Sequence, residues 1–239
     1  MGLFDISNFY GIIYIYFQKG ELLVENFLGL LIVFIIILFE PIMVYIIKKD
    51  KATIKGNSGE KYVAKELSRL NQKEYIVLND LLLVDEEGYT TQIDHVVVSI
   101  FGIFVVETKN YKGLIYGSDK QKNWTQNIYG NKSYFYNPIR QNYRHVKVIE
   151  YTLGCSNKII KPVIVFSDDA TLTVNSRNIV VNICELYDAI YYTDIQIMSE
   201  EEMIEYAQLL KQKNINTSQN MKNHINALKR GEIGYYYRN

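Results

Sequence analysis

The stretch TQIDHVVVSIFGIFVVETKNYKG spans residues 91–113, and it consists of two apolar runs that meet at Phe101-Gly102. Two short apolar runs joined by a glycine-containing pair are typical of a β-hairpin. The runs are almost continuously apolar, which favours a central hairpin covered on both faces of its sheet. We therefore expect the fold to be organised around this hairpin.

Three charged residues interrupt the hairpin at positions where a buried strand should be apolar. Side chains alternate along a strand, so Glu107 and Lys109 lie on one face. A two-residue loop at Phe101-Gly102 would set Asp94 opposite Lys109, and directly opposed residues share a face. Asp94, Glu107 and Lys109 are therefore expected to converge at the open end of the hairpin.

Two carboxylates and one ammonium group suit metal-assisted attack on a phosphodiester. Hard carboxylate oxygens bind Mg²⁺ together with its waters, and a lysine can orient the nucleophile or offset charge on the phosphorus. The alternative is a cross-strand ion pair between Asp94 and Lys109 on an exposed face, worth at most about 1 kcal/mol. The apolar runs on either side favour the functional interpretation, because they indicate a buried hairpin.

These residues resemble a known family. Asp94 and the triplet Glu107-Thr108-Lys109, with Gly59-Glu60 upstream, resemble the signature of the restriction-endonuclease-like PD-(D/E)xK nucleases. More narrowly, the hairpin is similar to the nuclease-related domain, NERD, of bacterial proteins, and the resemblance covers about residues 55–166. Ile93 stands where the wider superfamily often has a proline, which carries no chemistry. The resemblance implies an α/β fold, with a restriction-endonuclease-like mixed sheet flanked by helices, and a nuclease role.

The resemblance also implies roles for individual residues. Asp94 and Glu107 would be the ligands of Mg²⁺ or Mn²⁺. Lys109 would activate the nucleophile or stabilise charge, and Glu60 would be a supporting acid in the site. Glu60 precedes an apolar stripe at helical spacing, so it is expected on the buried face of a helix. Asn57 and Glu60 also fit a capping box, and the two roles of Glu60 can coexist.

The composition is that of a globular protein with an additional segment. The chain has 239 residues, of which 48% are apolar and 22% charged, and its 26 basic residues equal its 26 acidic ones. These values exclude a disordered protein. Cys155 and Cys184 lack the spacing of a zinc site or a disulfide framework, so we expect free thiols. His95 is expected to pack on the face opposite Asp94.

An apolar segment near the N-terminus predicts a membrane anchor. Residues 27–47 are apolar except for Glu40, and as a helix they would span roughly 30 Å, the thickness of a bilayer core. Several lysines follow the segment while Lys19 alone precedes it, which predicts a single-pass protein of the cell membrane with its C-terminal domain in the cytoplasm. The apolar patch at 9–17 is too short to cross, and its role stays open.

A basic region follows the hairpin. Residues 110–161 contain nine Lys or Arg against two acidic residues, a local excess of seven. Asn137-Pro138 predicts the start of a helix that runs to about Leu153. Along this helix we expect a basic stripe that binds nucleic acid. Gln141, beside the stripe, resembles a glutamine of related nucleases. The expected nucleic-acid-binding residues are Arg140, Gln141, Arg144 and Lys147. The alternative is an ordinary solvated helix face.

The remaining pattern completes the domain. Strands are predicted at 75–84, 114–116, 161–167 and 179–183, and helices at 186–192, 199–211 and 221–230. Trp124 and Gln126 belong to a segment that resembles the family, and packing is the simpler role for Trp124. The expected organisation is a membrane segment at 1–50, a nuclease-like core at 55–170, its C-terminal part at 171–213, and a linker with a terminal helix at 214–239.

Two functions follow from these features. The first is a membrane-anchored, Mg²⁺-dependent nuclease that hydrolyses cytoplasmic DNA, with RNA as a possible substrate. The second is a membrane-anchored module that keeps the fold and binds nucleic acid, or acts as a scaffold, without hydrolysis. A purely structural membrane protein, with the hairpin charges paired at its surface, is a third possibility.

Overall fold

The computed structural model describes residues 38–42, 58–191 and 195–233. The chain divides into two compact units, Met1–Ile54 and Lys55–Asn239. Residues 38–42 of the first unit are helical and exposed, and the rest of the predicted membrane span at 27–47 lies outside the described residues. None of the helices described is both long enough and apolar enough to cross a membrane.

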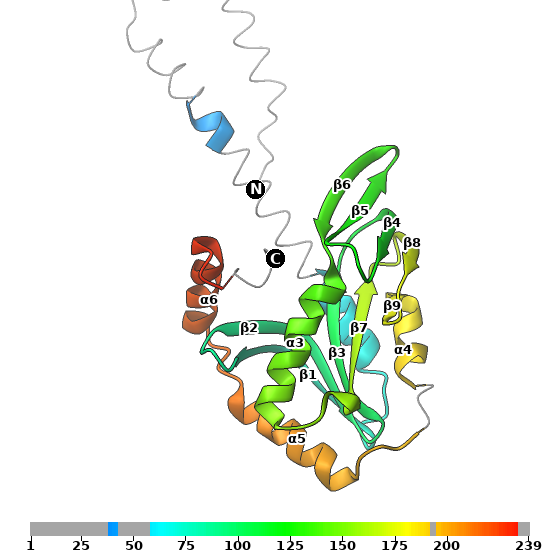
Figure 1. Cartoon of the computed structure of the whole chain (residues 1–239), viewed down its shortest axis with the longest axis vertical. Coiled ribbons are helices and arrows are strands. Elements are labelled where there is room, and N and C mark those ends of the chain that lie inside the picture. Colours follow the sequence, from blue (N-terminus) through cyan, green and yellow to red (C-terminus); the bar gives the residue numbers. More distant parts are fainter. Residues whose placement is uncertain (1–37, 43–57, 192–194, 234–239) are drawn as a thin grey trace, which may run out of the picture. The chain divides into compact units, whose positions relative to one another are not determined.

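The centre of the second unit is a five-stranded mixed sheet in the order β1-β2-β3-β7-β9 (Figure 1). The first three strands are antiparallel, and β7 and β9 run parallel to β3. The strands are β1 (Tyr75–Val84), β2 (Thr90–Ser99), β3 (Gly102–Lys109), β7 (Ile160–Phe166) and β9 (Ile179–Asn182). Because β3 lies in the middle and is covered on both sides, its run from Ile103 to Val106 is fully buried.

The predicted hairpin is present, but its register differs by two residues from the expected one. Ser99 pairs with Gly102, so the loop consists of Ile100 and Phe101 instead of Phe101 and Gly102. The Ser99 hydroxyl donates to the Gly102 carbonyl at 2.9 Å and accepts from the Phe101 amide at 3.2 Å, which stabilises the turn in this position. A shift of two residues leaves every side chain on its expected face.

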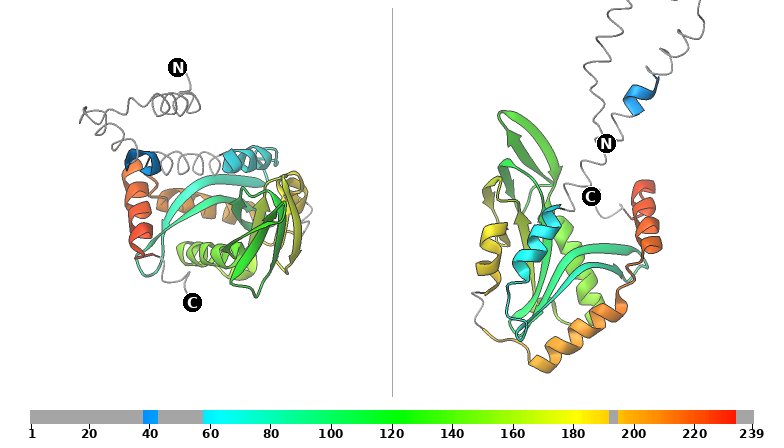
Figure 2. Two further views of the ribbon diagram at one scale, coloured as in Figure 1. Left: turned by 90° about the horizontal axis from the view of Figure 1, so that it is seen from above. Right: turned by 180° about the vertical axis from the view of Figure 1, so that it is seen from behind.

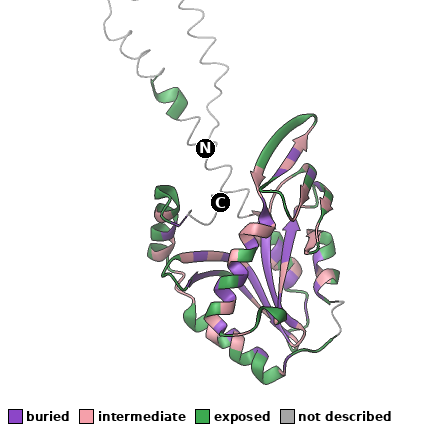
Figure 3. Cartoon of the chain, in the orientation of Figure 1, coloured by how far each residue is buried: buried purple, intermediate pink, exposed green. Residues whose placement is uncertain are grey.

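Helices cover both faces of the main sheet (Figure 2). One face, with Val96, Ile103 and Val105, packs against α3 (Pro138–Leu153) and α5 (Glu200–Lys213). The other face, with Phe104 and Val106, packs against a helix at residues 58–67 and against α4 (Ile183–Tyr191). In Figure 3 the central strands are buried while the outer sides of α5 and α6 are exposed.

A second, smaller sheet has the order β6-β5-β4-β8. Its strands are β4 (Gly113–Ser118), β5 (Asn123–Ile128), β6 (Asn131–Tyr136) and β8 (Ala170–Asn175). The expected strand at 114–116 is part of β4, whereas the other three strands were not expected. Trp124 is fully buried here, and its ring lies against Gly117, where a Cβ atom would come within 2.1 Å of it. Packing is thus a role that the structure assigns to Trp124.

The C-terminal segment packs back onto the β1–β2 hairpin. The Asn214 side chain accepts from the Leu82 amide at 2.9 Å, and the Ile215 amide donates to the Leu82 carbonyl at 3.0 Å. Thr217 caps α6 (Ser218–Arg230), which begins three residues before the helix expected at 221–230. The short 3-10 helix η1 (Asn157–Ile159) leads into β7.

Candidate active site

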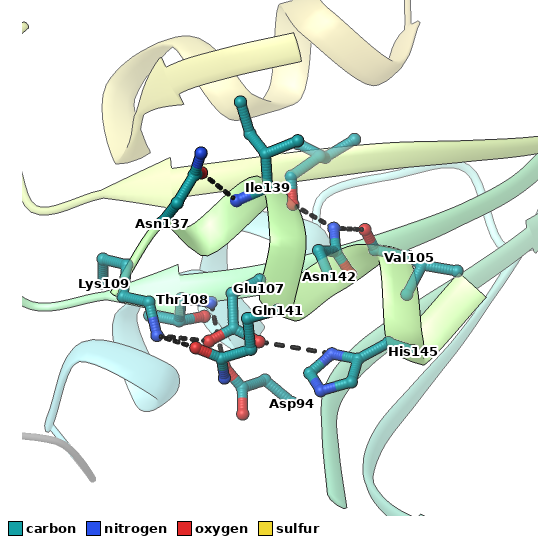
Figure 4. Close-up of polar contacts among 11 residues, drawn as sticks. Asp94, Val105, Glu107, Thr108, Lys109, Asn137, Ile139, Gln141, Asn142 and His145 are labelled. Atoms are coloured by element: carbon teal, nitrogen blue, oxygen red, sulfur yellow. Dashed lines mark hydrogen bonds and ion pairs between the residues drawn. The ribbon is translucent and has the colours of Figure 1, made fainter. Parts of the chain in front are cut away.

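The predicted site lies where β2 and β3 separate. Their backbone pairing ends at His95 and Val106, and beyond this point the Thr108 amide donates to the Asp94 carboxylate at 2.8 Å (Figure 4). A backbone amide of a buried strand needs an acceptor, and Asp94 provides it in place of a neighbouring strand. The hydrogen bond from Thr108 therefore holds Asp94 against the end of β3, at the point where β2 and β3 separate.

Glu107 and Lys109 form an ion pair at this opening. Lys109 Nζ lies 2.5 Å from Glu107 Oε1, and it donates a second hydrogen bond to Gln141 Oε1 at 2.8 Å. The Glu107 side chain is 3% exposed and that of Lys109 is 17% exposed, so the pair sits at the edge of the core. Gln141 was expected beside a DNA-binding stripe, and the structure instead directs its side chain to Lys109.

Helix α3 brings a histidine to the other side of Glu107. His145 Nδ1 lies 3.3 Å from Glu107 Oε2, and both side chains are 3% exposed. The buried Asn142 fixes this helix, since its amide donates to the carbonyls of Val105 and Val163 at 2.8 and 3.1 Å. The scattered histidines of the sequence had suggested no site. Helical spacing was the available signal, because His145 follows Gln141 by four residues.

Glu60 approaches the same charges from the helix at residues 58–67. Burial raises its pKa, and the negative charges of Asp80 and Glu107 raise it further, while Lys109 lowers it. The helix comes close to the end of β3, because a Cβ atom on Gly59 would lie 2.9 Å from the Asn110 side chain. Glycine permits this approach. The proposed partner of Glu60 in a capping box, Asn57, lies outside the described residues.

Burial and neighbouring negative charges raise the pKa values of Glu60 and Asp94 in the site. Burial raises the pKa of Asp94 well above its ordinary value, and the charge of Glu107 adds to the shift. Burial lowers the pKa of Lys109, but the charge of Glu107 and its hydrogen bond outweigh burial and raise it overall. Lys109 is therefore an ammonium group at neutral pH.

The side chains fit a magnesium-like ion only in part. Within the described ranges, no group of three or more His, Cys, Asp or Glu side chains is arranged to hold a metal. Mg²⁺, however, is often held by one or two carboxylates, with waters and substrate phosphates as the other ligands. Asp94 and Glu107 supply two such carboxylates, and Glu107 Oε2 is a buried oxygen without a hydrogen bond. This donor set is compatible with a hard divalent cation.

Comparison with known proteins found a family and a relative with similar sequences. Residues 55–167 match the family model of the nuclease-related domain, NERD. A protein of Bacillus anthracis described as uncharacterized is 46% identical over 125 residues, which cover 49% of this chain and 59% of that protein. The chain thus spans little more than half the length of this relative. The segment that matches the NERD model includes every residue of the site described above.

The basic residues of the NERD segment are not arranged as one free stripe. Arg144 forms an ion pair with Asp85 at 2.9 Å and donates to the Ile233 carbonyl at 3.0 Å. Arg140 donates to the Lys120 carbonyl at 2.9 Å, and Lys147 pairs with Glu150 at 2.6 Å. These three residues line a groove that Asp85, Glu86 and Glu87 also line, so its charge is mixed.

The structure adds Asp80 to the surroundings of the site. Asp80 lies in β1 with a φ of 53°, a conformation that non-glycine residues rarely adopt. Its carboxylate accepts from Gln92 Nε2 at 2.9 Å, and its charge acts on Glu60. Such strained residues often occur near functional sites. The signal in the sequence was the polar pair Asn79-Asp80 inside an otherwise apolar strand.

Proposed function

We propose that this protein is a divalent-metal-dependent nuclease that hydrolyses phosphodiester bonds of DNA. One observation carries the proposal: Asp94, Glu107 and Lys109 are gathered where β2 and β3 separate, in a segment that matches the nuclease-related domain. Two acids and an amine of this kind are costly to bury unless they serve a purpose. Metal-assisted phosphodiester hydrolysis uses all three.

In this proposal each side chain has a separate task. Asp94 and Glu107 would hold Mg²⁺ or Mn²⁺, which when bound supplies Lewis-acid activation of the phosphate and of a water molecule. Lys109, held by Glu107 and Gln141, would present its ammonium group to the phosphate or to the attacking water. Glu60 and His145 would orient and balance the carboxylates from either side.

A second candidate is a module of the same fold that binds nucleic acid without cutting it. The observation in its favour is the Lys109 amine, which lies 2.5 Å from Glu107 Oε1 and so occupies one of the carboxylate oxygens that a metal would use. A divalent cation would have to compete with this contact or bind through the other oxygens.

A cleavage assay separates the two candidates. We would incubate the full-length chain with single- and double-stranded DNA in Mn²⁺, in Mg²⁺ and in EDTA, beside a Lys109→Ala variant purified in the same way. The nuclease proposal expects cleavage that needs the metal and is lost in the variant. Equal cleavage by both proteins would indicate a contaminating nuclease, and DNA binding without cleavage would favour the second candidate.

We also propose that residues 27–47 anchor the chain in the cell membrane with the following domain in the cytoplasm. The support is the apolar run itself, which contains a single carboxylate, together with the lysines that follow it. Fractionation of cells tests the anchor, because an integral protein stays with the membranes after an alkaline wash. Release of the full-length chain by that wash would exclude it.

A further inference from the structure

The small sheet has one face that presents aromatic side chains to solvent. We call this the outer face, and it carries Tyr116, Thr125 and Tyr134. Pairing sets Tyr116 opposite Thr125, and Thr125 opposite Tyr134, so the three side chains form one row across β4, β5 and β6. Tyr116 is 39% exposed and Tyr134 is 72% exposed. Two tyrosine rings are thus presented to solvent on either side of a threonine.

The tip of the β5–β6 ribbon presents a third tyrosine. Tyr129 and Gly130 form the turn, with φ values of 50° and 89°, and the Tyr129 side chain is fully exposed. Two positive φ values are the signature of a turn that strongly prefers asparagine and glycine. A tyrosine here is conformationally unfavourable and packs on nothing that would compensate, which points to a role outside the fold. The ribbon extends beyond the main sheet in Figures 1 and 2.

The charge around these tyrosines suits a polyanion. The strands β4, β5, β6 and β8 contain no Asp or Glu, and Lys132 lies on the outer face opposite Asn127. Lys120 and Lys122 lie in the β4–β5 connection, where Asp119 is the single acid. Asp119 is engaged by the Arg177 amide at 3.1 Å and by the Asn178 amide group at 3.4 Å. The four strands themselves therefore carry a lysine and no carboxylate, which suits a phosphate, and Asp119 is the one acid of the connection beside them.

The small sheet is connected directly to the candidate active site. Lys109 ends β3, and β4 begins at Gly113 after a short connection. The Ser167 amide donates to the Lys109 carbonyl at 3.1 Å, and the Gly113 amide donates to the Asp169 carbonyl at 2.9 Å. These bonds fix the start of the small sheet to the end of β3. A nucleic-acid chain held at Lys109 would have this sheet as an adjoining surface.

We propose that the outer face and the ribbon tip bind an unpaired strand of nucleic acid, whose bases stack on Tyr116, Tyr134 and Tyr129 while Lys132 contacts a phosphate. Exposed aromatic rings interleaved with lysine are the means by which proteins hold single strands without reading their sequence. Duplex DNA buries its base faces and cannot use the tyrosines in this way. This inference rests on the proposed function, since it assigns the form of nucleic acid that the active site receives.

Binding measured in EDTA tests the inference apart from cleavage. We would titrate the full-length chain into a fluorescently labelled oligodeoxynucleotide, single-stranded or annealed to its complement, and follow anisotropy. Tyr116→Leu and Tyr134→Leu remove the rings and should each weaken single-strand binding on the order of tenfold, whereas Tyr→Phe at the same positions keeps the rings and the affinity. Tyr62→Leu is the matched control, because Tyr62 is 64% exposed on another element.

The tip provides a variant that should fold at least as well as the natural chain. Tyr129→Asn introduces a residue that the turn favours, so its melting temperature should be unchanged or higher while single-strand affinity falls. The inference is overturned if Tyr134→Leu and Tyr129→Asn both bind the single strand as the natural chain does. Cleavage by those variants at the natural rate would then leave the nuclease proposal intact. Single-strand binding that needs the tyrosines, without any cleavage in Mn²⁺, would instead support the inference and reject the nuclease.

Discussion

The buried carboxylate of Glu107 is held between two side chains, and His145 Nδ1 lies 3.3 Å from its Oε2 atom. Lys109 donates a hydrogen bond to the other oxygen, so each carboxylate oxygen of Glu107 has one nitrogen close to it. Burial lowers the pKa of His145, which outweighs the opposite effect of Glu107 and keeps the imidazole neutral at pH 7. A neutral imidazole can orient a metal-binding carboxylate without neutralising its charge.

We predict that His145→Leu weakens Mn²⁺ binding, because Glu107 loses the neighbour that orients it. The loss should be roughly 10- to 100-fold, which is typical for a residue behind a metal ligand. Calorimetric titration with Mn²⁺ measures it. His224→Leu is the control, since His224 is also buried but bonds to Thr90, away from the site. Equal Mn²⁺ affinities in the two variants would show that His145 does not support metal binding.

The second prediction concerns Asp94. Asp94→Asn should abolish Mn²⁺ binding and cleavage but raise the metal-free stability by about 1 kcal/mol, as replacements of strained active-site charges do. The asparagine oxygen can still accept from the Thr108 amide, so the backbone contact is kept. Thermal melts with and without Mn²⁺ measure both effects. A destabilised variant that still gains stability from Mn²⁺ would contradict the assignment of Asp94.

Lys109 should act on the reaction and not on the metal. We expect Lys109→Met to slow cleavage by a factor on the order of 10² or more, as the loss of one charge-stabilising donor does, while Mn²⁺ still binds. The exposed Lys112, three residues further along the chain, supplies the matched control Lys112→Met. If Mn²⁺ affinity falls together with the cleavage rate, Lys109 serves to hold the carboxylates in place.

The raised pKa of Asp94 predicts coupling between metal binding and protons. The folded chain binds this proton more tightly than the unfolded chain, so the contribution of Asp94 to stability is greatest at low pH. It declines as the pH rises from about 4 through the folded pKa. Because a metal requires the carboxylate, Mn²⁺ binding should release a proton and strengthen with pH across the same range. Calorimetry in buffers of different ionisation enthalpy would detect the proton, and buffer-independent heats would refute the coupling.

The sequence determined which faces of the central hairpin carry the charges, although it placed the register two residues away. Alternation has a period of two, so a shift of two residues changes pairings without changing faces. The register depends on contacts that no local pattern reveals. The Ile100 carbonyl, for example, accepts from the amides of Ile197 and Met198, which lie far along the chain.

The small sheet could not be predicted for a related reason. The β6 sequence NKSYFY alternates poorly between apolar and polar residues, and all of its first four residues are exposed. The sheet that contains β6 is completed by β8, which pairs with β4 although more than fifty residues of chain separate the two strands. Such strands are stabilised by distant pairing, so their own sequences carry a weak signal. The candidate site was easier to predict from the sequence, because charged residues within apolar strands are conspicuous.

The last prediction concerns Arg144, which the sequence suggested as a contact for DNA. In the structure its guanidinium pairs with Asp85, and the two side chains are only 11% and 9% exposed. Removing one partner of such a pair leaves the other charge poorly solvated, so Arg144→Met should lower the free energy of unfolding by about 3 kcal/mol. Lys147→Met is the comparison, because its exposed pair with Glu150 should contribute little to the free energy of unfolding.

Urea denaturation and DNA binding together decide between the two roles of Arg144. Asp85→Asn keeps the acceptor for the Tyr89 amide but removes the charge, so adding it to Arg144→Met should recover part of the lost stability. A phosphate contact would behave differently: DNA affinity would fall and depend less on salt, while stability stayed the same. That result would show that Arg144 contacts nucleic acid, as the sequence suggested. A loss of stability that Asp85→Asn partly reverses would instead make Arg144 the link between α3 and the β1–β2 hairpin.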